Sequence, residues 1–174
     1  PFLTDNITIR NCLITESHYG AISAVFQKGS GVDPNQVVIE DCVFRTGFES
    51  AIDIDNALEA TIRRCTFDGY KHGIHFAGGG SVVEDCLVFN SKLEGLKADI
   101  DENWNDKITE TVLRRCAFIG NGVDSPEGGV RLTDGPIRME NCIIAGNNGP
   151  GVRITTGSTM DVEAVIDHCD IYMN

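Results

Sequence analysis

The sequence predicts an all-β fold, a parallel β-solenoid of about seven coils with an internal stack of cysteines. Two observations lead to this prediction. All seven cysteines of the 174 residues occur in near-copies of one phrase, such as TIRRCTF at 61–67 and VLRRCAF at 112–118. Successive cysteines are 21 to 30 residues apart, and a repeat of this length indicates stacked structural units. The varying distance favours coils of one cross-section joined by loops of different length.

Each cysteine phrase alternates like a β-strand. An apolar residue stands three positions before the cysteine, namely Ile9, Ile39, Ile62, Val83, Leu113, Met139 and Ile166. Another stands two positions after it, namely Ile14, Phe44, Phe67, Val88, Phe118, Ile144 and Ile171. β-Branched and aromatic residues dominate both positions and no helical period is present, so each phrase is expected to form strand structure.

A second phrase precedes most of the cysteines. It starts with a small residue and continues with alternating apolar positions, as in GAISAV at 20–25, HGIHFA at 72–77 and PGVRIT at 150–155. This pattern predicts another short strand with two distinct faces. Each coil should therefore contain at least two strands separated by tight turns.

These repeats resemble those of the parallel β-helix repeat proteins in the right-handed, pectin-lyase-like superfamily. The resemblance covers nearly the whole chain and implies a right-handed parallel β-helix in a single domain, 1–174. The superfamily includes lyases, hydrolases, epimerases, phage tailspikes, adhesins and copper-accessory proteins, so the resemblance leaves the function open. Neither end of the sequence resembles a cap. We therefore expect a segment of a longer chain, or self-association through exposed coil ends.

The residue two positions before each cysteine alternates in charge over the first six coils. The series is Arg10, Glu40, Arg63, Glu84, Arg114, Glu140 and Asp167. Stacked strands lie about 4.8 Å apart, so these side chains would neighbour one another, and opposite charges would attract. The arginine pairs are thus predicted to belong to a surface charge ladder. A register slip of one coil would bring like charges together and is disfavoured.

The cysteines are expected to pack in the core as free thiols. Stacked strands keep their Cα–Cβ vectors parallel, which disfavours disulfides, and the number of cysteines is odd. No cysteine and histidine cluster has the spacing of a zinc site. A small apolar side chain that fills the core is the simpler interpretation, with metal binding as the alternative.

Composition excludes some classes of function. The formal net charge of −12 argues against general nucleic-acid binding, which requires neutralisation of phosphates by Lys and Arg. No apolar run approaches the roughly 18 residues of a membrane span. No basic segment followed by an apolar stretch opens the sequence, so no signal peptide is expected in it. The resemblance implies an extracellular or cell-surface location.

The second phrase places one outward residue per coil in a row that includes Asp53, His75, Lys97, Arg131 and Arg153. Three successive cations, offset in part by Asp99 and Asp134, favour binding of an acidic polysaccharide through its uronate or sulfate groups. The resemblance to polysaccharide lyases and epimerases implies Lys97 as the base, Arg131 as the group that neutralises the carboxylate, and His75 as an auxiliary acid.

Carboxylates in the same region allow two other interpretations. Asp53 with Asp55 or Asp99 could hydrolyse a glycosidic bond, because residues i and i+2 of a strand are about 6.7 Å apart. The Asn-x-Asp, Asp-Asp and Gly-His-Gly motifs of pectin hydrolases are absent, however. Asp53, Asp55, Asp99 and Asp101 could instead bind Ca²⁺ through hard oxygens. Trp104 is either a platform for stacking sugars or a buried loop anchor.

Two classes of function follow from the sequence. The first is a carbohydrate-active protein that binds, cleaves or epimerises an acidic polysaccharide on an outer strand face. The second is a non-catalytic structural or adhesive β-helix of a cell or virion surface. Loss of glycan binding on mutation of Lys97 or Arg131, without loss of stability, would separate the first from the second.

Overall fold

The computed structural model describes residues 7–25, 36–55, 60–77, 80–99, 110–156 and 163–174. Trp104 and Asp101 lie outside these residues. No helix in the described stretches is long and apolar enough to cross a membrane.

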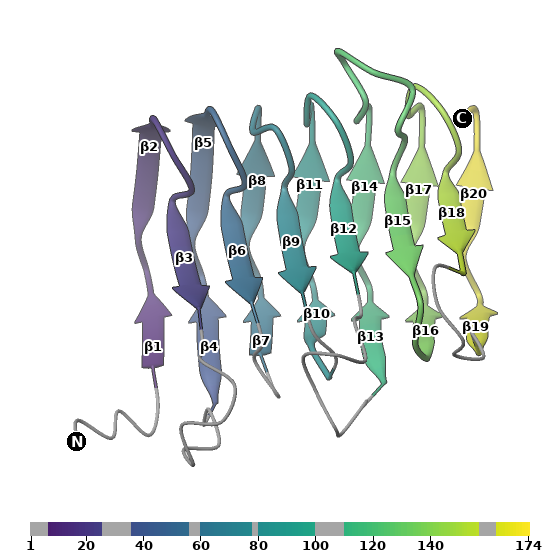
Figure 1. Cartoon of the computed structure of the whole chain (residues 1–174), viewed down its shortest axis with the longest axis horizontal. Coiled ribbons are helices and arrows are strands. Elements are labelled where there is room, and N and C mark those ends of the chain that lie inside the picture. Colours follow the sequence, from purple (N-terminus) through teal and green to yellow (C-terminus); the bar gives the residue numbers. More distant parts are fainter. Residues whose placement is uncertain (1–6, 26–35, 56–59, 78–79, 100–109, 157–162) are drawn as a thin grey trace.

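Short strands form three parallel sheets (Figure 1). Sheet A contains β1 (Ile7–Arg10), β4 (Val37–Glu40), β7 (Ala60–Arg63), β10 (Val82–Glu84), β13 (Thr111–Arg114), β16 (Ile137–Glu140) and β19 (Ala164–Asp167). Sheet B contains β2 (Leu13–Ser17), β5 (Val43–Gly47), β8 (Thr66–Asp68), β11 (Leu87–Phe89), β14 (Ala117–Ile119), β17 (Ile143–Ala145) and β20 (Asp170–Tyr172). Sheet C contains β3 (Ile22–Val25), β6 (Ile52–Asp55), β9 (Ile74–Ala77), β12 (Leu96–Asp99), β15 (Val130–Thr133) and β18 (Val152–Thr155).

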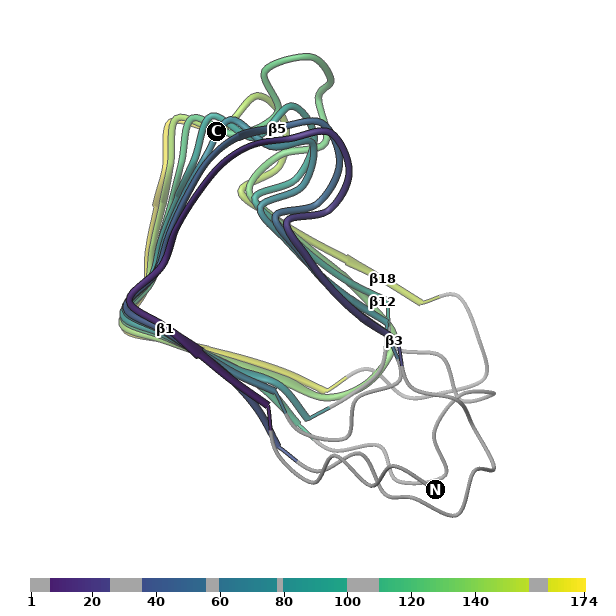
Figure 2. The same ribbon diagram turned by 90° about the vertical axis from the view of Figure 1, so that its left-hand side faces the viewer.

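Each coil passes through sheets A, B and C in turn, and successive coils superimpose when viewed along the axis (Figure 2). The cysteine phrase supplies both an A strand and a B strand, with the bend at the cysteine. The second phrase supplies the C strand, so the predicted all-β solenoid is confirmed. The figure of about seven coils is slightly high. In the described residues the last coil, β19 and β20, has no C strand, and only the five central cysteines are buried.

The core lies inside the coil and consists of the residues expected from the alternation. Five central cysteines are buried, whereas Cys12 and Cys169 at the ends are partly exposed. Each central thiol donates a weak hydrogen bond to a backbone carbonyl two residues earlier, for example from Cys65 to Arg63 O at 3.3 Å. Burial raises the pKa of Cys42, so this thiol stays neutral at physiological pH. The cysteine stack is therefore a packing feature in the described residues.

Two bends in every coil require a left-handed backbone. The bend between sheets A and B has φ of 50° to 55° at Asn11, Asp41, Arg64, Asp85, Arg115, Asn141 and His168. The bend at the far end of sheet B has positive φ at Glu16, Thr46, Gly69, Asn90, Gly120, Gly146 and Met173. Non-glycine residues adopt this conformation at a cost, and Asn and Asp tolerate it best. Equal bends in every coil keep the three sheets in register.

The predicted charge ladder is confirmed. The register pairs Arg63 with Glu40 on one side and with Glu84 on the other. Arg63 Nη2 lies 2.7 Å from Glu40 Oε2. Solvent screens such pairs and leaves them a small contribution to stability, so their main effect is on register.

Candidate functional site

The outward side chains of sheet C form a surface that we call the charged face. It consists of Asp53, Asp55, His75, Lys97, Asp99, Arg131 and Arg153. Strand alternation turns these side chains outward, since Ile52 and Ile54 on the same strand are buried. The register places the expected residues in one row on successive coils, namely Asp53, His75, Lys97, Arg131 and Arg153. Asp55 and Asp99 lie in the neighbouring row.

His75 lies between two carboxylates. Its Nδ1 is 2.8 Å from Asp53 Oδ1, and its Nε2 is 3.6 Å from Asp99 Oδ2. Lys97 Nζ contacts the same Asp99 oxygen at 2.5 Å. Burial alone would disfavour the imidazolium, but the two carboxylates outweigh burial and raise the pKa of His75 to about 9. At neutral pH His75 is therefore a cation that donates a hydrogen bond to Asp53.

The carboxyl groups of Asp53 and Asp55 are shifted in opposite directions. The hydrogen bond from His75 outweighs burial and lowers the pKa of Asp53. Burial, together with the nearby charge of Asp53, raises the pKa of Asp55. Opposite shifts in two adjacent carboxyl groups are typical of acid and base pairs. Asp53 therefore loses its proton more readily than Asp55.

Acidic side chains from the turns before sheet C neutralise the two arginines. Arg131 Nη1 lies 3.4 Å from Glu94 Oε1, and Arg153 Nη1 lies 2.8 Å from Glu127 Oε2. Glu94 also faces His72, with 2.9 Å between Oε2 and Nδ1. The sequence predicted that Asp99 and Asp134 offset part of this positive charge, and they account for only part of the charge balance. The turns contribute two further carboxylates, so the arginines are not an uncompensated positive run.

Glu94 is the most buried charge at this site. Its side chain is only 2% exposed. Burial would raise the pKa of Glu94, but its contacts with His72 and Arg131 outweigh burial and lower it to about 2. Sequence reasoning missed His72, Glu94 and Glu127 because it followed only the strand positions. His72 and Glu94 each stand three residues before a residue of the row, which is the signal that could have identified them.

Hidden polar atoms without a hydrogen bond are concentrated here. Of six such side-chain atoms in the described residues, five belong to this region, namely His72 Nδ1, His75 Nε2, Glu94 Oε2, Asp99 Oδ1 and Arg131 Nε. The contact between His72 and Glu94 is close but poorly aligned for a hydrogen bond. Folded proteins leave few polar atoms in this condition, and each requires an explanation. The ion pairs of this region therefore leave part of their hydrogen-bonding capacity unused.

One group at the site has donor atoms that could surround a cation. Atoms of Asp53, Asp55 and His75 lie within 4.8 Å of one another. Asp99 faces His75 on its other side and is not part of this group, and the register places Ala77 between Asp55 and Asp99. Asp101 lies outside the described residues. A set that mixes carboxylate and imidazole suits transition metals, whereas Ca²⁺ prefers oxygen alone. Binding of Ca²⁺ stays a prediction.

Stability should fall at alkaline pH through His75. Because the folded pKa is raised from 6.5 to about 9, its contribution is complete below pH 6.5 and is lost as the pH rises through 9. His75→Gln should remove on the order of 2–3 kcal/mol of this pH-dependent stability. The free energy of unfolding in urea, compared between pH 6.5 and pH 9 for the wild type and the variant, measures this contribution. His168→Gln, at an exposed position, is the control and should change nothing. An unchanged pH profile in His75→Gln would contradict the assignment.

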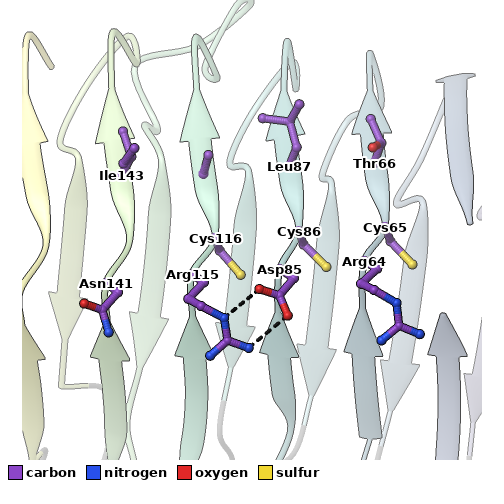
Figure 3. Close-up of a pocket in the computed structure, with 11 residues that line it drawn as sticks. Arg64, Cys65, Thr66, Asp85, Cys86, Leu87, Arg115, Cys116, Asn141 and Ile143 are labelled. Atoms are coloured by element: carbon purple, nitrogen blue, oxygen red, sulfur yellow. Dashed lines mark hydrogen bonds and ion pairs between the residues drawn. The ribbon is translucent and has the colours of Figure 1, made fainter. Parts of the chain in front are cut away.

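Away from the charged face, a hollow follows the bend between sheets A and B (Figure 3). It has a volume of about 530 Å³, with Cys65, Cys86 and Cys116 along its floor. Arg115 lines the hollow and donates two hydrogen bonds to the carboxylate of Asp85, of 2.6 and 2.9 Å. These groups satisfy one another, and the thiols are buried. The hollow is therefore best explained by the charge ladder, and we assign it no chemistry.

The parallel coils, the cysteine stack and the polar outer sheet define a β-solenoid that carries a potential ligand-binding face on one side. The family described as right handed beta helix region matches residues 3–174. The chain therefore belongs to the right-handed β-helix family, as the repeats suggested. No curated protein and no solved structure matches it. Membership is consistent with a carbohydrate-active or a structural β-helix protein, since the family contains both.

Proposed function

We propose that the charged face binds an acidic polysaccharide. The observation that carries the proposal is Arg131. Its side chain is 33% exposed, and its ion-pair contact with Glu94 in the described part of the chain is long at 3.4 Å. A guanidinium has five N–H donors, so Arg131 keeps several for a carboxylate or sulfate. Arg153 on the next coil extends the same cationic end.

The opposite end of the face suits sugar hydroxyls. Asp53 and Asp55 present carboxylate oxygens, which accept hydrogen bonds from hydroxyl groups. The face thus runs from acceptors at the low-numbered coils to donors at Arg131 and Arg153. A polymer with both hydroxyls and anionic groups is complementary to this order. An extracellular or cell-surface location would bring the protein to such a polymer.

Binding is supported better than cleavage. Lys97 is ion-paired with Asp99 and His75 is cationic, so neither offers a free base at neutral pH. The roles of Lys97, Arg131 and His75 in β-elimination stay predictions. Glycosidic hydrolysis by Asp53 and Asp55 is the second candidate, because their pKa values diverge and their oxygens are close. A carboxyl separation of about 5 Å is typical of retaining enzymes.

Arg131→Ala should weaken binding to polygalacturonate or alginate by about tenfold or more, because a charge-assisted hydrogen bond contributes about 1.5–3 kcal/mol. Retardation in affinity gels measures the effect, with neutral xylan as a comparison polymer. Arg138→Ala is the matched control. Arg138 lies on β16 of sheet A, away from the charged face, and its side chain is 36% exposed and ion-paired with Glu110. It should bind like the wild type.

The same incubations distinguish the alternatives. Unsaturated uronate ends, lost in Lys97→Ala, would establish a lyase, and new reducing ends, lost in Asp55→Asn, would establish a hydrolase. Equal binding by the wild type and Arg131→Ala would remove the charged face as the binding surface. No retention of the wild type on any acidic or neutral polymer would overturn the proposal in favour of a structural or adhesive β-helix.

A further inference from the structure

A hollow lined by exposed aromatic residues lies at the turns between sheets B and C. We call it the aromatic hollow, and it consists of His18, Tyr19, Phe48 and Glu49, with a volume of about 540 Å³. Tyr19 is 80% exposed and Phe48 is 65% exposed. Phe48 is the only exposed phenylalanine in the described part of the chain. These two side chains do not serve the core.

The turns that present the aromatic hollow are held in place. Phe48 N donates to Ser17 O at 3.0 Å, and Lys71 N donates to Glu49 O at 3.1 Å. The first three coils are thereby linked through their turns. The backbone of such a site loses little conformational freedom when a ligand binds. The backbone that carries the exposed rings is therefore held in place.

The polar groups around the rings indicate what the ligand offers. His18 and Glu49 line the aromatic hollow and can bond to hydroxyls. Lys92 Nζ lies over the Phe48 ring, 5.2 Å from its centroid, so one face of this ring carries a positive charge. Lys71 Nζ is already paired with Glu49 at 2.9 Å. A ligand with an apolar ring face, hydroxyls at its edge and a negative charge matches these groups.

We propose that the aromatic hollow is a second carbohydrate subsite that stacks one pyranose ring of the polysaccharide bound by the charged face. The C–H face of a pyranose packs on Tyr19 or Phe48, its hydroxyls bond to His18 and Glu49, and a uronate carboxylate faces Lys92. The turn that carries Phe48 and Glu49 leads directly into the strand that carries Asp53, four residues after Glu49. The inference rests on the proposed function for the class of ligand.

Tyr19→Ala and Phe48→Ala test the subsite, with binding to polygalacturonate measured in affinity gels. Each variant should bind about fivefold more weakly or worse, as expected for aromatic residues that dominate an interface. Tyr19→Phe should retain most of the wild-type affinity because it keeps the aromatic ring. Tyr172→Ala is the matched control, since Tyr172 is 52% exposed on the last coil and distant in sequence from the aromatic hollow. It should bind like the wild type.

The outcomes separate this subsite from the proposed function. If Arg131→Ala loses affinity while Tyr19→Ala and Phe48→Ala keep it, the subsite is overturned and the charged face stands. If Tyr172→Ala loses as much as Tyr19→Ala, the effect is not specific and the subsite is likewise overturned. If the wild type binds no polymer, both proposals fail. A dimer in sedimentation that Tyr19→Ala dissociates would replace the sugar with a second copy of this chain.

Discussion

Replacing Phe67 with alanine is expected to lower the free energy of unfolding by about 3–5 kcal/mol, the range for a large aromatic side chain in a core. Phe67 is fully buried on β8. Its ring stacks on that of Phe44, with centroids 4.8 Å apart and planes 8° from parallel. On the other side the register places Val88 against it. Both neighbours are held by their own strands and can fill the vacated space only in part. Urea unfolding at neutral pH measures the change.

Phe48→Ala provides the control for this measurement. It removes the same atoms from a ring that is 65% exposed, so its effect on stability should lie within about 0.5 kcal/mol. That result would also show that the subsite variant is folded. A loss below about 1 kcal/mol in Phe67→Ala would contradict the rigid stack, because it would mean that Phe44 and Val88 collapse into the cavity.

Asn147→Ala should cost roughly 3 kcal/mol, the second largest loss that we expect, because it leaves several buried groups unbonded. The Asn147 side chain is buried at the end of sheet B. Its Oδ1 accepts from Asn121 N at 2.9 Å, and its Nδ2 donates to Phe118 O at 3.1 Å. It also bonds to Asn174 Oδ1 at 2.8 Å, so one residue links three coils. Thermal or urea unfolding measures the loss.

Asn148→Ala is the matched control for Asn147→Ala. Asn148 is the next residue, is exposed, and donates one side-chain hydrogen bond, to Gly122 O at 3.0 Å. Its loss should cost well under 1 kcal/mol, since water replaces the bond. Equal losses in the free energy of unfolding at the two positions would show that the buried hydrogen bonds of Asn147 stabilise the fold no more than that of an exposed asparagine.

Much of the fold could be predicted from the sequence because the coil repeats one solution. The apolar positions around Cys65, including Ile62 and Phe67, are buried as expected. The left-handed bends were not foreseen, because Arg64 and Arg115 conceal them behind the charge pattern. Asn and Asp at four of the seven equivalent positions were the available signal. Asn90 does not belong to the buried row of Asn121 and Asn147, since it occupies the second left-handed bend and Ser91 N bonds to Asn121 Oδ1 instead.

The candidate site was only half visible in the sequence. The register of the row from Asp53 to Arg153 follows from the repeat alone. The partners of its arginines do not, because Glu94 and Arg131 are 37 residues apart and meet only through a turn. Likewise, Tyr19 and Phe48 carry no repeat signature, so their exposure became apparent only in three dimensions. The repeat predicts which strand residues share a row, but it does not predict where the side chain of a turn residue points.

The way the coils stack has a thermodynamic consequence. Each coil bonds only to the coil before and the coil after it, so its cooperativity extends along one dimension. Met139, for example, is fully buried between its register partners Leu113 and Ile166 on the two neighbouring coils. A coil that loses its order should therefore weaken first the coils on either side of it, and unfolding should spread coil by coil. The row from Asp53 to Arg153 spans five successive coils, so the charged face depends on the order of all of them.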